Sequence, residues 1–327
     1  MPWKSIIKPV YWFFLLALSG IGQSQADWLK QSRNIMGTLI TVELWSENPP
    51  RAKLCSEQVF TEMHRIDALM SPFKSSSELS DINQHASQRA VPVSSELFDL
   101  IQQSIHFSDQ SSGAFDITFA SIGFKYDYRL HKKPDLQTIR QNLKAINYKN
   151  LILKNQSVKF SMPDMSIDLG GIAKGYAVDQ AIKILQQCGI QQALVSAGGD
   201  SKILGDKRGR PWVIGIQHPR KKQAVALSIP LTDTAISTSG DYERFFLSNN
   251  ERIHHIINPR TGKSAKQSWS ATVIGPNAVS TDALSTTIFI LGAEEGLKLI
   301  NSLDNIDAII IDSNGVVHYS SGLEDPA

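Results

Sequence analysis

The chain has 327 residues, 42% of them hydrophobic, which is enough to bury a large core in one domain or in two closely joined lobes. Lys4 and Lys8 supply the whole formal net charge of +2, and no acidic residue precedes Asp27, so the part from residue 27 onward is neutral. The basic runs at 207–210 and 220–222 are short and are expected to be solvated loop charges, which argues against a nucleic-acid partner.

The N-terminal segment has the layout of a secretory signal. Two lysines precede an apolar run over 10–18, and small and polar residues then end in SQA at 24–26. We predict a signal peptide over 1–26, cleaved after Ala26, and a single domain over 27–327. The apolar run is too short for a comfortable membrane span, which favours cleavage over a retained anchor.

The first half of the mature chain is predicted to be mainly helical. Alternation over 38–44 predicts a strand, and apolar residues recur at helical spacing over 51–70, before Pro72. A serine-rich loop is expected at 74–83. Further helices are predicted over 94–108 and 134–146, followed by a hairpin that pairs 151–154 with 157–160.

The two cysteines, Cys55 and Cys188, lie in helical patterns with apolar neighbours. No CxxC or Cys/His spacing accompanies them, which argues against a zinc site. They form one disulfide in an exported chain or remain two buried thiols, and the sequence leaves both possibilities open.

The second half is predicted to begin with a strand at 166–169, a glycine turn and a helix over 172–187. A meander follows, with strands over 193–196, 201–204, 212–217, 224–230, 234–237, 242–247, 253–257 and 269–274. Two helices at 279–291 and 293–303 and two strands at 308–311 and 316–319 complete the chain. The expected fold class is α+β, with largely antiparallel sheets packed with helices.

The sequence STDALSTT at 280–287 carries oxygen-bearing side chains at helical spacing. Asp282, Ser285 and Thr286 stand at i, i+3 and i+4, so a helix would present all three on one face. A carboxylate with one or two hydroxyls is an incomplete magnesium shell that suits a phosphate ligand. The alternative is that Ser280, Thr281 and Asp282 are N-cap residues.

Glycine pairs offer two further candidate binding turns. In DLGGIAKG at 168–175, the glycines allow a close backbone approach, the following helix N-terminus favours an anion, and Lys174 adds a cation. SAGGD at 196–200 is a ligand-lining turn or simply a tight hairpin. His255 ends an apolar strand, where functional side chains reach a pocket mouth, although lone histidines are often structural.

Taken in order, the motifs resemble those of the ApbE family of FAD:protein FMN transferases. The resemblance rests on MGT at 36–38, MSPF and SELSDIN at 70–83, GAFD at 113–116, DLGGIAKGYAVD at 168–179, SAGGD at 196–200, STSGDYE at 237–243, HIINPRTG at 255–262 and STDALSTT at 280–287. It implies an ApbE-like fold and an enzyme that splits FAD with Mg²⁺. The enzyme would attach FMN to a Thr or Ser of an exported acceptor, typically a respiratory flavoprotein subunit.

The resemblance also implies roles for individual residues. His255 falls on the position of the base, and the metal ligands fall on the Gly171 carbonyl, Asp282 and Thr286, with Ser285 beside them. The FAD contacts fall on Met36, Phe73, Ala114, Phe115, Asp116, Asp168, Lys174 and Ile257.

The chain departs from the family pattern at two places that matter for localisation and the site. Ile21 stands where exported members often carry a lipidated cysteine, which excludes a diacyl anchor and favours a soluble periplasmic enzyme. The stretch 117–129 replaces a common glycine-proline sequence, so the site wall there differs. The same site could also admit water and act as an FAD pyrophosphatase, or bind FAD without turnover as a periplasmic flavin carrier.

Overall fold

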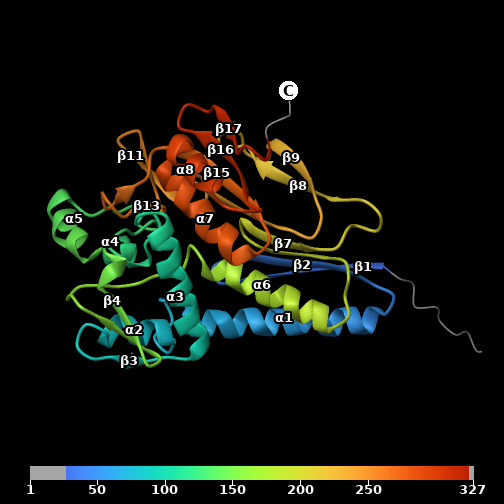
Figure 1. Ribbon diagram of the computed structural model, residues 1–327, viewed down its shortest axis with the longest axis horizontal. Coiled ribbons are helices and arrows are strands. Elements are labelled where there is room, and N and C mark those ends of the chain that lie inside the picture. Colours follow the sequence, from blue (N-terminus) through green and yellow to red (C-terminus); the bar gives the residue numbers. More distant parts are fainter. Residues whose placement is uncertain (1–26, 324–327) are drawn as a thin grey trace, which may run out of the picture.

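The computed structural model describes residues 27–323, and the predicted signal peptide lies outside this range. An eight-stranded sheet, in which all neighbouring strands are antiparallel, forms the centre of the molecule (Figure 1). In spatial order its strands are β1 (Asp27–Ile35), β2 (Thr38–Ser46), β6 (Ala193–Ala197), β7 (Asp200–Leu204), β10 (Ala235–Gly240), β15 (Ser268–Gly275), β16 (Asp307–Asp312) and β17 (Val317–Tyr319).

Three helices pack against this sheet and against one another in the order α1, α6, α7 (Figure 1). The α-helices are α1 (Pro49–Met70), α2 (Glu78–His85), α3 (Ser95–Gln110), α4 (Ala120–Gly123), α5 (Leu136–Asn142), α6 (Ala173–Gln187), α7 (Ala278–Leu291) and α8 (Ala293–Ile300). Short 3₁₀ turns are η1 (Ile117–Phe119), η2 (Leu143–Ala145) and η3 (Tyr148–Asn150). Within residues 27–323, no helix combines the length and hydrophobicity needed to cross a bilayer.

Smaller sheets surround the main one. They are β3 (Val91–Pro92) with β5 (Ser157–Phe160) and β4 (Leu151–Lys154), β8 (Trp212–Gln217) with β9 (Val225–Leu231), β11 (Phe245–Ser248) with β12 (Glu251–His254), and β13 (Ile257–Asn258) with β14 (Lys263–Ser264). The β11–β12 hairpin packs on the segment that holds α4 and α5 through a small apolar cluster that includes Ile122, Tyr126 and Phe246. This cluster fixes the loops on either side of β11 and β12.

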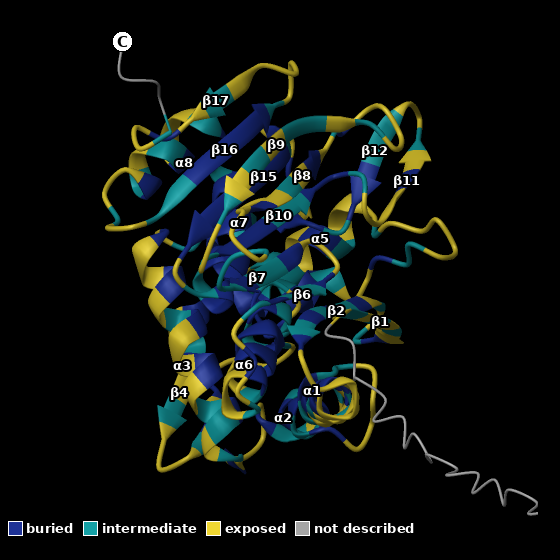
Figure 2. Ribbon diagram, turned by 90° about the vertical axis from the view of Figure 1, so that its right-hand side faces the viewer, coloured by how far each residue is buried: buried dark blue, intermediate teal, exposed yellow. Residues whose placement is uncertain are grey.

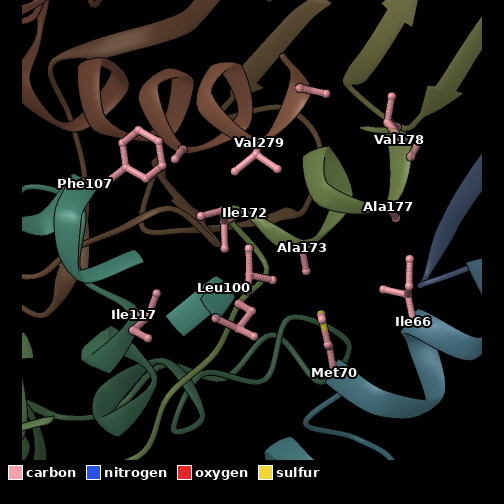
Figure 3. Close-up of a cluster of buried hydrophobic side chains, with 14 of the residues drawn as sticks. Ile66, Met70, Leu100, Phe107, Ile117, Ile172, Ala173, Ala177, Val178 and Val279 are labelled. Carbon is pink, nitrogen blue, oxygen red and sulfur yellow. The ribbon is translucent and has the colours of Figure 1, made fainter. Parts of the chain in front are cut away.

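The main core lies between the sheet and the helices (Figure 2). Figure 3 shows how side chains from α1, α3, α6 and α7 meet there, among them Ile66, Leu100, Ala177 and Val279. Ile172 is fully buried in this cluster and directly follows Gly171. Core packing therefore anchors the glycine turn that precedes α6.

The predicted α+β class with a largely antiparallel sheet is confirmed. The single domain over 27–327 stays a prediction. Two local predictions are wrong. The serine-rich stretch at 74–83 contains the start of α2, whose N-cap Ser77 accepts a hydrogen bond from Ser80 N at 3.0 Å. The stretch 166–169 is not a strand, because the Asn83 side chain bonds both Ile167 N and Ile167 O, at 2.8 and 2.9 Å.

Two further strand predictions are only partly right. The predicted strand at 242–247 begins at Phe245, because residues 241–244 form a turn after β10. The predicted strand at 253–257 is divided between β12 and β13. Both differences place backbone turns at residues that border the site described below.

A disulfide joins Cys55 on α1 to Cys188, the C-cap of α6. The two cysteines are 133 residues apart in sequence, and their Cα atoms are 6.2 Å apart. The bond settles the question that the sequence left open and ties together two of the helices that cover the sheet.

Breaking this bond should lower the free energy of unfolding by about 2–4 kcal/mol, because it closes a long loop in the unfolded chain. Urea unfolding of the oxidised protein, the protein reduced with dithiothreitol and the double variant Cys55→Ala/Cys188→Ala measures the effect. The reduced protein and the double variant should share one midpoint, and dithiothreitol should not change that of the variant. Equal midpoints for the oxidised and reduced wild type would contradict the prediction.

Candidate active site

Helix α7 carries the predicted oxygen ligands in a buried setting. Its N-cap is Asn277, whose side chain accepts from Ser280 N at 2.8 Å, so the alternative that Asp282 belongs to the N-cap is wrong. Asp282, Ser285 and Thr286 follow within the helix, and only 2% of Asp282 is exposed. A carboxylate buried this deeply needs charged or hydrogen-bonding partners.

The partners of Asp282 come from α6. Lys174 Nζ lies 3.2 Å from both Asp282 oxygens and 2.6 Å from Asp200 Oδ2, and Gly175 N donates to Asp282 Oδ2 at 2.9 Å. Burial is the main cause, and the charge of the Asp200 carboxylate the second, that raises the pKa of Asp282 to about 7. Burial alone would lower the pKa of Lys174, but Asp200 and Asp282 reverse this and raise it. A charged lysine therefore faces two carboxylates from β7 and α7.

Gly175 allows α6 and α7 to approach closely at this point. A Cβ at Gly175 would lie 2.1 Å from Ala278 O and 2.8 Å from Asp282 Cβ, distances that Cβ atoms essentially never show. The missing side chain lets Gly175 N reach the Asp282 carboxylate.

Gly175→Ala should therefore destabilise the protein by about 1–3 kcal/mol, because the two helices must move apart. Thermal or urea unfolding of the variant measures this loss. Gly215→Ala is the matched control, since its Cβ would meet only Val225 side-chain carbons at 3.4 Å. Equal stabilities for the two variants would argue against close helix packing at Gly175.

The glycine turn before α6 lies directly beside α7. A Cβ added at Gly171 would lie 3.4 Å from Thr286 Oγ1 and 3.2 Å from Phe115 Cε2. Ser239 Oγ on β10 lies 2.9 Å from Ser285 Oγ and 3.2 Å from Thr286 Oγ1, and Ser285 Oγ also donates to Asp282 O at 2.9 Å. The backbone of Gly171 and the Thr286 hydroxyl thus lie close together, while their role as metal ligands stays a prediction.

The candidate metal donors are the Asp282 carboxylate, the hydroxyls of Ser285 and Thr286, and the nearby backbone of Gly171. Such hard oxygen groups suit magnesium. Within residues 27–323, no group of three or more His, Cys, Asp and Glu side chains is arranged to hold a metal ion. Any metal here would be held by fewer than three such side chains, together with hydroxyl and backbone oxygens, which leaves positions for a ligand.

His255 lies between β12 and β13 in the same region. Its backbone N donates to Arg244 O at 3.1 Å, and its buried Nδ1 has no hydrogen-bond partner among the described residues. Burial, followed by the charges of His254, Arg244 and Lys174, lowers the pKa of His255 to about 3. The imidazole is therefore neutral at physiological pH and able to accept a proton.

The lowered pKa of His255 predicts a pH-dependent loss of stability. The unfolded chain binds a proton at this histidine below about pH 6.5 and the folded chain does not until about pH 3, so stability falls as pH drops through this window. The loss is at most about 1.4 kcal/mol per pH unit. Between pH 7 and 4.5, urea unfolding of the wild type should show a larger loss than His255→Gln. Parallel curves would contradict the prediction.

Asp168 and the turn that holds Met36 both lie near Arg244. Asp168 Oδ1 accepts from Gly170 N at 2.7 Å, and burial raises its pKa against the opposing charges of Arg244 and Lys174. Met36 has a left-handed φ of 55° in the β1–β2 turn, and the carbonyl of the next residue, Gly37, accepts from Arg244 Nη2 at 3.1 Å.

The other predicted FAD contacts are more spread out. Ala114 and Phe115 are buried, and Ile257 lies in the smaller apolar cluster. The Asp116 carboxylate is occupied by Thr118 N, Thr118 Oγ1 and Tyr148 N at 2.6–2.9 Å. Phe73 is 81% exposed, and its ring contact among the described residues is an edge-to-face pair with Phe124 at 6.3 Å.

A cavity of about 510 Å³ opens beside Asp116, with Tyr148, Pro259 and Arg260 in its lining. It adjoins the predicted segments 113–116 and 255–262. Another cavity, of about 660 Å³, lies over α8 and His318 and is lined by none of the predicted site residues.

Sequence reasoning missed Ser239 and Arg244 and left Asp200 undecided. Ser239 and Asp200 stood inside the motifs STSGDYE and SAGGD, so their position in a motif was the available signal. Arg244 follows STSGDYE directly and carried no signal of its own.

Two solved structures share this fold over almost the whole chain. The ApbE protein of Thermotoga maritima is 33% identical, with a TM-score of 0.83, covering 90% of this chain and 98% of that one. The flavin transferase ApbE of Vibrio cholerae is 26% identical, with a TM-score of 0.80, covering 91% and 98%. Fold and relatives together define the protein as an enzyme of the transferase class.

Sequence comparison gives the family. The ApbE family model matches residues 36–310. The FAD:protein FMN transferase of Klebsiella pneumoniae (strain 342) is 32% identical over 88% of this chain and 90% of the relative, and that of Treponema pallidum (strain Nichols) is 28% identical over 97% and 95%. The chain belongs to the ApbE family, and the family prediction made from its motifs is confirmed.

Proposed function

We propose that the protein is a magnesium-dependent FAD:protein FMN transferase, which cleaves FAD, attaches FMN through a phosphoester to a Thr or Ser of an acceptor protein and releases AMP. The observation that carries this proposal is the convergence of Lys174, Asp282, Thr286 and the Gly171 turn from α6 and α7. The names of the relatives support the same reaction.

In this reaction, the acceptor hydroxyl oxygen attacks the phosphorus on the FMN side of the diphosphate. The bond from that phosphorus to the AMP oxygen breaks, and His255 takes the hydroxyl proton. The lowered pKa keeps His255 unprotonated before the substrate arrives. The negative charge of a bound diphosphate would raise that pKa and make the imidazole a stronger base.

The residues present fit a magnesium ion. Asp282, Thr286 and the Gly171 carbonyl would hold it, and Ser285, whose hydroxyl donates to the Asp282 backbone carbonyl, lies beside them. A bound magnesium would polarise the phosphoryl oxygens and neutralise charge on the departing phosphate. Lys174 stays beside Asp282 as a further positive charge.

The remaining predicted contacts suggest how FAD would lie. Phe115 packs against the Gly171 turn, and the cavity beside Asp116 offers space for a part of the dinucleotide away from the reacting phosphorus. The exposed ring of Phe73, paired with Phe124, is available to stack on the isoalloxazine.

The test uses the purified protein, FAD, Mg²⁺ and a respiratory flavoprotein subunit as candidate acceptor, with the acceptor mass and released AMP measured together. We expect the acceptor to gain one FMN in step with AMP, and none after EDTA treatment. Free FMN and AMP without an adduct would indicate an FAD pyrophosphatase. Tight FAD binding that ignores Mg²⁺ and produces no AMP would indicate a flavin carrier.

We also propose that the enzyme acts in the periplasm as a soluble protein without a lipid anchor. The signal-like N-terminus and the Cys55–Cys188 disulfide support export, because such bonds persist in oxidising compartments. Ile21, at the position where a lipidated cysteine would stand, supports the absence of an anchor. Cell fractionation with mass determination of the purified chain tests it. A cytosolic protein that retains residues 1–26 would contradict it.

A further inference from the structure

The charge of the site raises a difficulty for an anionic substrate. Lys174 is engaged by both Asp200 and Asp282, and Asp168 adds a third carboxylate nearby. A diphosphate entering this site brings more negative charge, and one engaged lysine does not balance it. A further cation close to the diphosphate would reduce this repulsion.

Arg244 meets this need by its position. It lies on the exposed turn between β10 and β11, and its carbonyl accepts from His255 N at 3.1 Å. Its Nη2 donates to Gly37 O at 3.1 Å in the turn beside Met36. The arginine therefore bridges the predicted base and a predicted FAD-contact segment.

The Arg244 guanidinium is also free of carboxylate partners among the described residues. Among the described residues it makes no salt bridge, whereas Lys174, Lys202, Arg220 and Arg252 each have a carboxylate partner. Its charge is felt at both Asp168 and His255. A guanidinium held by one backbone carbonyl keeps further N–H donors for two oxygens of a phosphate.

We propose that Arg244 binds the diphosphate of FAD and so positions it beside His255, an inference that rests on the proposed function. Arg244 would then act as a positioning cation, while Lys174 chiefly holds Asp200 and Asp282 in place. Lysine cannot reproduce the forked geometry, so Arg244→Lys should recover only part of the affinity lost in Arg244→Gln.

Equilibrium binding separates this role from a purely structural one. With Mg²⁺ present, Arg244→Gln should bind FAD and ADP about 10- to 100-fold more weakly than the wild type, and riboflavin, which has no phosphate, equally well. Arg208→Gln is the matched control, because Arg208 is an exposed arginine that stacks over Trp45 and makes no salt bridge within residues 27–323. It should bind all three ligands like the wild type.

Two outcomes would overturn the inference alone. Unchanged FAD and ADP affinity in Arg244→Gln would show that the guanidinium does not contact the diphosphate. Equal weakening for FAD and riboflavin would show that Arg244 only holds the Gly37 turn. A wild-type protein that binds FAD without transferring FMN would contradict the proposed function, and the binding test of Arg244 would still apply. A wild-type protein that binds no FAD would overturn both the proposed function and the inference about Arg244.

Discussion

Replacing His255 with alanine should slow FMN transfer by about 10²- to 10⁴-fold, the usual contribution of a general base. The neutral imidazole lies beside Arg244, and its buried Nδ1 has no hydrogen-bond partner in the described part of the chain, so its loss removes the proposed proton acceptor. FAD affinity should change little, because the proton moves only during the chemical step. Steady-state rates of adduct formation and FAD titration of the same preparation measure the two effects separately.

His106→Ala is the control for this variant, since His106 is exposed on α3. Circular dichroism and thermal unfolding verify that His255→Ala is folded. A folded variant that transfers FMN at more than a tenth of the wild-type rate would remove His255 from the role of base.

Asp282→Asn should reduce Mg²⁺-dependent transfer by about 10³-fold or more. The asparagine keeps the shape and can still accept from Gly175 N, but it removes the negative charge that would bind the metal and that faces Lys174. Added Mg²⁺ should restore little activity, because an amide oxygen is a weaker ligand for a hard cation than a carboxylate. Rates measured across a Mg²⁺ titration provide the test.

Asp312→Asn is the matched control. Asp312 lies at the end of β16, outside the candidate site, where it pairs with His318. Its Mg²⁺ dependence should equal that of the wild type. If Asp282→Asn kept the wild-type Mg²⁺ dependence and rate, the metal would have to bind elsewhere.

The local parts of the site could be predicted from the sequence. The spacing of Asp282, Ser285 and Thr286 predicted that they share one face of a helix, and the glycines at 170 and 171 predicted a backbone turn at the start of α6. These inferences depend only on helix geometry and on the freedom of glycine. They did not depend on knowing which strands are neighbours in the sheet.

The pairings across the sequence could not be predicted in this way. Lys174 and Asp282 are 108 residues apart and meet where α6 packs on α7, and Arg244 and Gly37 are 207 residues apart, so these contacts depend on helix packing and on the strand order. The same limit explains the error at 166–169, where the side chain of Asn83 replaces a neighbouring strand as hydrogen-bond partner. Spacing along the chain carries no information about such partners.

A crystal structure with FAD and Mn²⁺ tests the proposed metal site most directly, because the anomalous signal locates the metal. We predict one strong peak about 2.1 Å from an Asp282 carboxylate oxygen, Thr286 Oγ1 and the Gly171 carbonyl, shared with an FAD phosphate oxygen. A metal bound to the FAD phosphates but distant from Asp282, or no metal between α6 and α7, would contradict the account.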